Sequence, residues 1–224
     1  MIEAVVFDLD GVLIDSEPAW EQVRRSLVAE YGGRWPPEAQ SRLMGMSTRE
    51  WAQYLVELGV GLPPEQVADL VIDRMVEHYA QELPLLRGAL GAVRRLAGRW
   101  PLGLASSSPR RLIDAVLARS GLAALFSSTV STEEVARGKP APDVYLAVTE
   151  RLGVHPAACV AVEDSTNGLR SALAAGLIAM AVPQPAYPVD GTVLQQAARV
   201  LPSLDELTAD LVESLAREGR PEGP

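Results

Sequence analysis

The sequence has little cysteine, no long apolar run and no basic N-terminal region, and each of these absences excludes a structural feature. Its 224 residues include a single cysteine, Cys159, which excludes an intramolecular disulfide and predicts a reducing, cytoplasmic setting. No apolar run approaches the roughly 18 residues that a membrane-spanning helix needs, so no membrane association is expected. The opening MIEAVVFDLDG has no basic residues ahead of its apolar run. We interpret it as a first strand and not as a signal peptide.

Positive charge is also scarce. The formal net charge is −9, with 20 lysine and arginine residues against 29 aspartate and glutamate residues, and no basic stripe is visible. Nucleic acid is therefore not expected as a partner. An acidic protein that binds an anion has to create local positive charge with a metal ion, a lysine or a helix N-terminus. The composition predicts no particular oligomeric state.

Two polar residue types occur only once. Lys139 is the only lysine, and Asn167 is the only asparagine. In a chain that otherwise uses arginine, a lone lysine indicates a task that needs a compact ammonium and not a planar guanidinium. Lys139 is therefore a functional candidate, while Asn167 either caps a helix or lies in a binding site.

From residue 88 onward the pattern alternates between helical and strand-like segments. Such alternation predicts a doubly wound parallel α/β sheet, a Rossmann-like core with helices on both faces. The elements expected after the first strand, EAVVFDLD, are strands over 101–108, 127–131, 159–164, 177–183 and 199–203, and helices over 88–97, 110–121, 142–153 and 166–176. A last helix is expected to start at a capping box of Ser203 and Glu206.

Residues 16–82 follow a different pattern, with helical stretches and no convincing strand. A capping box of Ser47 and Glu50 predicts the start of one of these helices. We interpret the segment as a helical cap domain inserted directly after the first strand. The core domain would then consist of residues 1–15 and 83–224.

Polar side chains follow three of the predicted strands and precede one helix. They are Asp8 and Asp10 after the first strand, Ser106, Ser107 and Ser108 after the second, Glu163 and Asp164 after the strand CVAVED, and Lys139 in GKPAPD. Ligands of parallel α/β sheets bind beyond the carboxyl ends of the strands. We therefore expect these groups to converge on one edge of the sheet.

The chemistry of these groups is complementary. Asp8, Glu163 and Asp164 offer hard oxygen ligands suited to Mg²⁺, and clustered carboxylates need a cation to stay ionised. Lys139 and Ser106 can hold the oxygens of a substrate phosphate. A carboxylate can then attack phosphorus and form an aspartyl phosphate.

Two further groups complete this reaction scheme. Asp10 lies two residues beyond Asp8 and can protonate the leaving oxygen, then deprotonate the attacking water. The backbone N–H groups at Ser107 and Ser108 can also contact phosphate. The combination predicts Mg²⁺-dependent phosphoryl transfer from a small-molecule phosphate ester.

Four motifs in this order, DLDGVLIDSE, LASSS, GKPAPD and VEDSTNG, resemble those of the haloacid dehalogenase-like hydrolase superfamily. The helical insertion is similar to the small helical cap of that family. The resemblance implies that Asp8 is the nucleophile, Asp10 the acid/base, and Ser106 and Lys139 the phosphoryl-binding groups. The Mg²⁺ ligands that it implies are Asp8, the Asp10 carbonyl, Glu163 and Asp164. The dehalogenases lack a carboxylate at the Asp10 position, so its presence indicates phosphate chemistry.

Within the family, DSEPAW and GMSTREW look like the subgroup of sugar-phosphate phosphatases and β-phosphoglucomutase-like proteins. We therefore expect a phosphatase that hydrolyses a small phosphate monoester, such as a sugar or polyol phosphate. The alternatives are a phosphosugar mutase and a non-catalytic, phosphate-binding relative. The intact pair of Asp8 and Asp10 argues against a pure binder, which needs no acid/base group.

The expected substrate-specificity residues lie mostly in the cap. They are Trp20, Gly45, Arg49 and Asn167. By resemblance, sugar mutases place a histidine near position 20 and an arginine in the loop after the cap glycine. This chain has tryptophan at position 20, and Arg49 lies one residue later than in the mutase pattern. Hydrolysis is therefore favoured over transfer.

Overall fold

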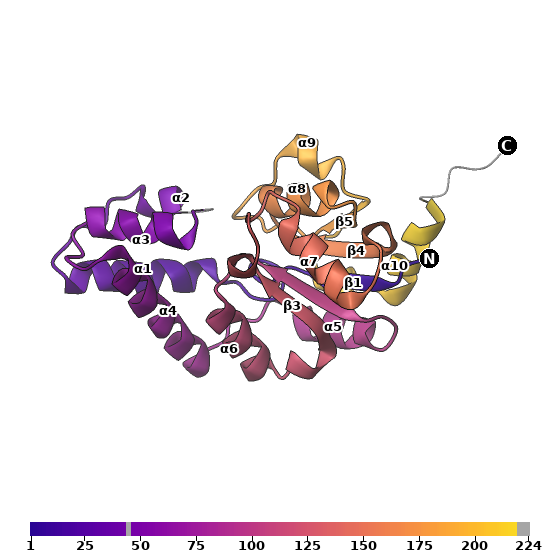
Figure 1. Cartoon of the computed structure of the whole chain (residues 1–224), viewed down its shortest axis with the longest axis horizontal. Helices are drawn as coiled ribbons and strands as arrows, with labels where there is room; N and C mark the ends of the chain where they lie inside the picture. Colours follow the sequence, from indigo (N-terminus) through magenta and orange to yellow (C-terminus); the bar gives the residue numbers. More distant parts are fainter. Residues whose placement is uncertain (44–45, 219–224) are drawn as a thin grey trace. The chain divides into compact units, whose positions relative to one another are not determined.

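A computed structural model of the chain describes residues 1–43 and 46–218 (Figure 1). The chain divides into two compact units. One unit is formed by Met1–Asp15 together with the chain from Pro84 onward, and the other by Ser16–Leu83. Gly45, one of the predicted specificity residues, lies outside the described residues.

The first unit is built on a six-stranded parallel sheet with the order β3-β2-β1-β4-β5-β6 (Figure 1). The strands are β1 (Ala4–Phe7), β2 (Leu102–Ser106), β3 (Phe126–Ser131), β4 (Cys159–Glu163), β5 (Ile178–Ala181) and β6 (Arg199–Val200). Strands β1, β2 and β4 are buried along their whole length, and β1 and β4 are rich in alanine and valine, as expected for a sheet covered on both faces. The predicted doubly wound fold is confirmed.

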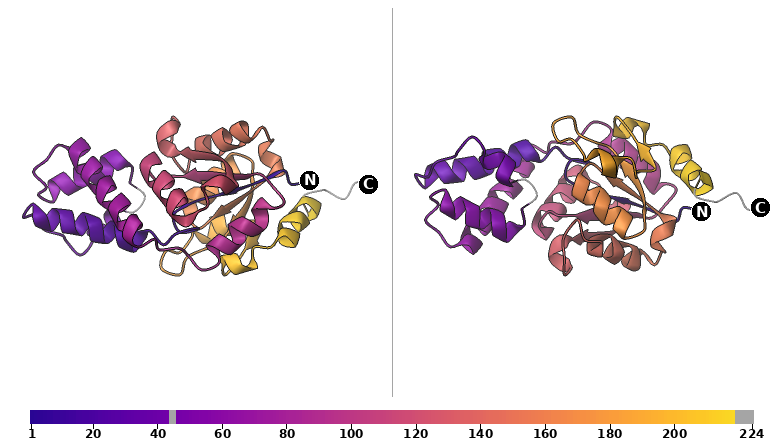
Figure 2. Two further views of the ribbon diagram at one scale, coloured as in Figure 1. Left: turned by 90° about the horizontal axis from the view of Figure 1, so that it is seen from below. Right: turned by 90° about the horizontal axis from the view of Figure 1, so that it is seen from above.

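Helices connect the strands of this sheet. They are α5 (Ala89–Ala97), α6 (Arg110–Ser120), α7 (Asp143–Leu152), α8 (Thr166–Ala174), α9 (Gly191–Leu194) and α10 (Ala209–Glu218), with the short 3₁₀ turns η1 (Ala123–Leu125), η2 (Thr132–Glu134), η3 (Pro156–Ala158) and η4 (Leu204–Glu206). Helix α7 contacts α8, whereas α5 and α6 both contact η1. Right-handed crossovers place these two pairs on opposite faces of the sheet (Figure 2).

The face under α7 and α8 holds a continuous apolar core. Alternate residues of β1, Ala4 and Val6, pack in one cluster with Val144, Tyr145 and Val148 of α7. The period of two along the strand and the helical spacing along α7 explain why these residues share a face. Helix α7 contacts β3, β2 and β1, so this packing fixes its position against these three strands.

The strand order reverses between β1 and β4. From β1 the chain proceeds outward to β2 and β3, and then crosses back to β4 on the other side of β1. Phe7 of β1 is in register with Val162 of β4, and the backbone N–H of Asp8 donates to the Val162 carbonyl at 3.0 Å. Residues that follow β1 and β4 are therefore neighbours. Such a switch point is the usual ligand site of an open α/β sheet.

The second unit consists of four helices, α1 (Glu17–Glu30), α2 (Ala39–Leu43), α3 (Thr48–Glu57) and α4 (Pro64–Gln81), among its described residues. Helix α4 contacts both α1 and α3. The predicted capping box starts α3, because the Ser47 hydroxyl accepts from the Glu50 N–H and the Glu50 carboxylate accepts from the Ser47 N–H. Across the parts of the chain that the structure describes, no helix is both long and apolar enough to cross a membrane.

The capping box predicted at Ser203 and Glu206 is wrong. Residues Leu204–Glu206 form the 3₁₀ turn η4, and the Ser203 side chain makes no capping hydrogen bond. The Thr208 hydroxyl instead accepts a hydrogen bond from the Leu211 N–H at 3.2 Å, at the start of α10. The sequence signal was right about a helix but placed its start too early.

Candidate active site

Three carboxylates meet at the switch point. Asp8 follows β1, Glu163 is the last residue of β4, and Asp164 comes next. One carboxylate oxygen from each residue lies within 4.8 Å of the others. All three residues are at least nine-tenths buried, Glu163 completely. The structure therefore brings these residues together in a buried cluster of hard oxygen donors, the kind of ligand that Mg²⁺ prefers.

Lys139 lies between two of these carboxylates. Its Nζ is 2.8 Å from Oδ1 of Asp8, 2.6 Å from Oε1 of Glu163 and 2.9 Å from the carbonyl oxygen of Ala105. An ammonium has three hydrogens to donate, so these three acceptors use all of them. The predicted contact between Lys139 and a substrate phosphate therefore requires that one of the three bonds be released.

The surroundings of the cluster disfavour the ionised forms of Asp8 and Asp164. Burial raises the pKa of the Asp8 carboxyl to about 8, against the opposing effect of the Lys139 ammonium. Burial and the charge of Asp8 raise the pKa of Asp164 to about 9. Burial alone lowers the pKa of Lys139, but the carboxylates of Asp8 and Glu163 outweigh it and raise that pKa. One ammonium thus faces three carboxylates, and a divalent cation would keep all of them ionised.

Two glycines leave room for the carboxylates. Gly11 has φ +75°, and a Cβ there would lie 1.9 Å from Oδ2 of Asp164. Gly168 is in the first turn of α8, and a Cβ there would lie 1.8 Å from Oε2 of Glu163. Each glycine therefore permits the position of one candidate metal ligand.

A Gly168→Ala variant is expected to lose about 10²-fold or more in turnover, because the new methyl group must displace the Glu163 carboxylate from its place. Alanine is the better helix former, so α8 itself should not be weakened. The measurements are phosphate release at saturating Mg²⁺ and the melting temperature. Gly91→Ala is the matched control, because Gly91 is also helical and has nothing within 4 Å of an added Cβ. Equal activity of the two variants would contradict the prediction.

Asp10 is held by two serine hydroxyls. Its Oδ2 accepts from Oγ of Ser108 at 2.7 Å and from Oγ of Ser106 at 3.3 Å. Its Oδ1 is buried and has no hydrogen-bond partner among the described residues. The orientation of this carboxylate is fixed while one oxygen stays available for a proton. Ser108 appeared in the sequence only as a turn residue with a useful backbone N–H, and its hydroxyl contact was missed.

Three of the other predicted residues have exposed side chains. Ser107 and Asn167 are exposed. The side chain that caps α8 is Ser165, whose hydroxyl accepts from the Gly168 N–H at 3.0 Å, so the interpretation of Asn167 as the cap is wrong. Arg49 is exposed on α3.

Trp20 belongs to the interior of the helical unit. It is 7% exposed, and its ring centroid lies 6.0 Å from that of Trp51. The guanidinium carbon of Arg24 lies 4.4 Å from the Trp20 ring centroid and 5.0 Å from that of Trp51. Burial lowers the pKa of Arg24 to about 10, so this arginine remains a cation inside the unit.

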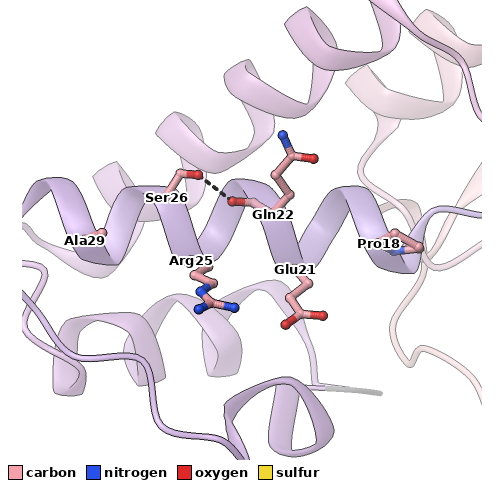
Figure 3. Close-up of a pocket in the computed structure, with 6 residues that line it drawn as sticks. All are labelled: Pro18, Glu21, Gln22, Arg25, Ser26 and Ala29. Carbon is pink, nitrogen blue, oxygen red and sulfur yellow. Dashed lines mark hydrogen bonds between the residues drawn. The ribbon is translucent and has the colours of Figure 1, made fainter.

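A shallow hollow on the helical unit is not a rival site. Figure 3 shows its six lining residues, Pro18, Glu21, Gln22, Arg25, Ser26 and Ala29, all on α1. The Ser26 hydroxyl donates to the Gln22 carbonyl of the same helix at 2.7 Å. The hollow contains one carboxylate and no cluster of metal ligands, unlike the switch point.

The fold and the site together define a doubly wound α/β protein with a lysine-bridged carboxylate cluster at its switch point. The sequence profile of the haloacid dehalogenase-like hydrolases matches residues 2–176. The chain belongs to this family and is an enzyme.

Named relatives cover most of the chain. It is 35% identical to hexitol phosphatase B of Escherichia coli K12 over 214 residues, which is 93% of this chain and 95% of the relative. It is 36% identical to a phosphorylated carbohydrates phosphatase of Thermotoga maritima, over 79% of this chain and 82% of the relative. It also resembles the crystal structure of a putative β-phosphoglucomutase from Thermotoga maritima, with TM-score 0.77, 32% identity, and coverage of 95% and 99%.

Proposed function

We propose that the chain is a Mg²⁺-dependent phosphatase that hydrolyses a small phosphorylated sugar or polyol through a phosphoaspartate at Asp8. One observation carries this proposal. Three carboxylates and one ammonium converge at the switch point between β1 and β4, beside the Asp10 carboxylate, one oxygen of which has no partner in the described part of the chain. The names of the two phosphatase relatives support sugar or polyol phosphates as the substrate class.

In the first half-reaction, a carboxylate oxygen of Asp8 attacks phosphorus and the ester bond to the leaving oxygen breaks. The leaving alkoxide takes its proton from Asp10, whose Oδ1 has no hydrogen-bond partner among the described residues. The Ser106 hydroxyl, released from its 3.3 Å contact with Asp10, and an ammonium hydrogen released by Lys139 hold the phosphoryl oxygens. The products of this step are the free alcohol and phosphoaspartate.

In the second half-reaction, Asp10 takes a proton from water, the water oxygen attacks phosphorus, and the acyl phosphate bond breaks. Asp8 is regenerated and inorganic phosphate leaves. The groups that would hold Mg²⁺ are Asp8, the backbone carbonyl of Asp10, Glu163 and Asp164. When bound, Mg²⁺ would neutralise charge on the phosphoryl group and on the carboxylates.

The helical unit would serve as the cap that selects the substrate. Closure of a cap excludes water and commits the substrate to transfer. We assign specificity within this proposal to Trp20, Gly45 and Arg49, with Asn167 contributed by the core. A cytoplasmic place of action is part of the proposal, because the lone cysteine Cys159 is a free, buried thiol that suits a reducing compartment.

A second candidate function is a phosphosugar mutase, since the chain resembles the structure of a putative β-phosphoglucomutase. A mutase must return the phosphoryl group to a second sugar hydroxyl before water attacks. Trp20 cannot supply the acceptor and donor nitrogens of the histidine expected there, and it is occupied by packing against Trp51 and Arg24. Without that trigger, Asp10 is free to activate water and hydrolysis should win.

Product partition separates these two functions. The enzyme is given Mg²⁺ and β-glucose 1-phosphate with a trace of the 1,6-bisphosphate, and inorganic phosphate and glucose 6-phosphate are followed together. We expect release of phosphate with little glucose 6-phosphate. Predominant glucose 6-phosphate would overturn the phosphatase in favour of the mutase. A parallel phosphate-release screen over sugar and polyol phosphates, with and without a chelator, identifies the substrate and tests the metal requirement.

A further inference from the structure

Tyr145 directs a polar atom into the site from helix α7, two residues beyond the end of the GKPAPD motif. It lies in the first turn of α7, and none of its surface is exposed. Its hydroxyl is 2.6 Å from Oε1 of Glu163, the distance of a short hydrogen bond to a carboxylate. A tyrosine hydroxyl can donate one hydrogen, and this acceptor uses it.

Oε1 of Glu163 accepts from two donors. The Lys139 ammonium is 2.6 Å from the same oxygen, the same distance as the Tyr145 hydroxyl. A carboxylate oxygen has about two lone-pair sites, so both are used. Within the described residues, the one hydrogen bond to the other oxygen, Oε2, is a long contact of 3.4 Å from the Ser165 hydroxyl. Oε2 is therefore the oxygen of Glu163 that remains for a metal ion.

The two donors to Oε1 differ in the number of other acceptors that they bond. Lys139 is shared, because it also bonds Asp8 and the Ala105 carbonyl. Tyr145 is dedicated to Glu163, and its ring lies in the core cluster beneath the sheet edge. The ring centroid is also 5.2 Å from the Lys139 ammonium, within the range of a cation–π contact. Tyr145 thus holds Glu163 even when Lys139 changes partners.

We propose that Tyr145 is a positioning residue that fixes the Glu163 carboxylate for metal binding through Oε2 alone. The proposal rests on the proposed function, because it presupposes that Glu163 is a ligand of the metal ion. Groups that orient a metal ligand in this way typically affect metal affinity or activity by 10–100-fold. The role goes beyond packing, because the ring could fill the same space without its hydroxyl.

The test is a Tyr145→Phe variant of the full chain, which removes the hydroxyl and keeps the ring. Mn²⁺ is the probe, because it takes the same oxygen ligands as Mg²⁺ and its free concentration is measured by electron paramagnetic resonance. We expect Mn²⁺ affinity to fall by about 10-fold or more. Tyr31→Phe is the matched control, because Tyr31 is exposed and belongs to the helical unit. This variant should bind Mn²⁺ as the wild type does.

A double-mutant cycle separates positioning from a general loss of stability. In a Glu163→Gln background, Tyr145→Phe should change Mn²⁺ affinity much less than in the wild type, because the group that it orients is altered. A purely structural effect would persist in both backgrounds and would overturn the proposal. Unchanged Mn²⁺ affinity in Tyr145→Phe would overturn it while leaving the phosphatase function intact. A wild type that binds no Mn²⁺ would overturn both.

Discussion

Replacing Asp8 with asparagine is expected to lower turnover of phosphate esters by at least about 10⁴-fold while the fold stays intact. The nucleophile of the proposed mechanism is a carboxylate oxygen, and an amide cannot form the acyl phosphate. The substitution keeps the shape of the side chain, and its remaining oxygen can still accept from Lys139, which lies 2.8 Å away. It also removes one of three clustered carboxylates, so repulsion within the site should decrease.

Three measurements check this result. Phosphate release gives the turnover, the melting temperature reports the fold, and mass spectrometry of enzyme trapped with substrate locates the phosphoryl group. Wild-type enzyme should carry it on Asp8, and the variant should carry none. Asp210→Asn is the matched control, because Asp210 is exposed, belongs to the same unit and lies outside all of the motifs. An active Asp8→Asn enzyme would contradict the mechanism.

The positions of the carboxylates could be predicted from the sequence because the ends of the strands are visible in it as the points where apolar runs give way to polar residues. Two buried apolar runs, β1 and β4, end directly in Asp8 and in Glu163 with Asp164. A parallel sheet gathers such ends on one edge, and the alternation of helices and strands identified the sheet as parallel. The lone lysine was found through composition, which needs no structural information at all.

Tyr145 and the hydroxyl of Ser108 could not be predicted in the same way. The period of α7 indicates only that Tyr145 faces the core, whereas the direction of its hydroxyl depends on how α7 packs against the sheet. The contact of Ser108 with Asp10 depends on the turn after β2, which brings two separate loops together. Hydrogen bonds between elements that are distant in sequence follow from tertiary packing and not from local pattern.

The burial of Arg24 in the helical unit could not be predicted from the sequence pattern either. Arg24 is a charged residue in an amphipathic helix, where charge normally indicates the solvent face. It is only 6% exposed, because its guanidinium lies over the rings of Trp20 and Trp51, and the charge of Glu17 also favours its cationic form. A sequence pattern does not distinguish a cation that is hydrated from one that lies between aromatic rings.

Replacing Lys139 with arginine is expected to lower kcat/KM by about 10²-fold or more, although the positive charge is retained. The three acceptors of Lys139 lie 2.6–2.9 Å from one nitrogen, so they surround a single point. A guanidinium spreads its hydrogens over a planar fork and cannot place three of them around one atom. It is also larger, and the Lys139 side chain is only 5% exposed, so the carboxylates of Asp8 and Glu163 would be pushed apart.

The expected loss therefore comes from displaced ligands, and it should appear in Mn²⁺ affinity as well as in phosphate release. Arg87→Lys is the matched control, because it exchanges the same two side chains in an ion pair with Asp205 where the arginine is 91% exposed. Such exposed pairs contribute little, so this variant should keep the wild-type melting temperature and activity. If Lys139→Arg keeps full activity and full Mn²⁺ affinity, a compact ammonium is not required. The presence of lysine at position 139 would then have no functional requirement behind it.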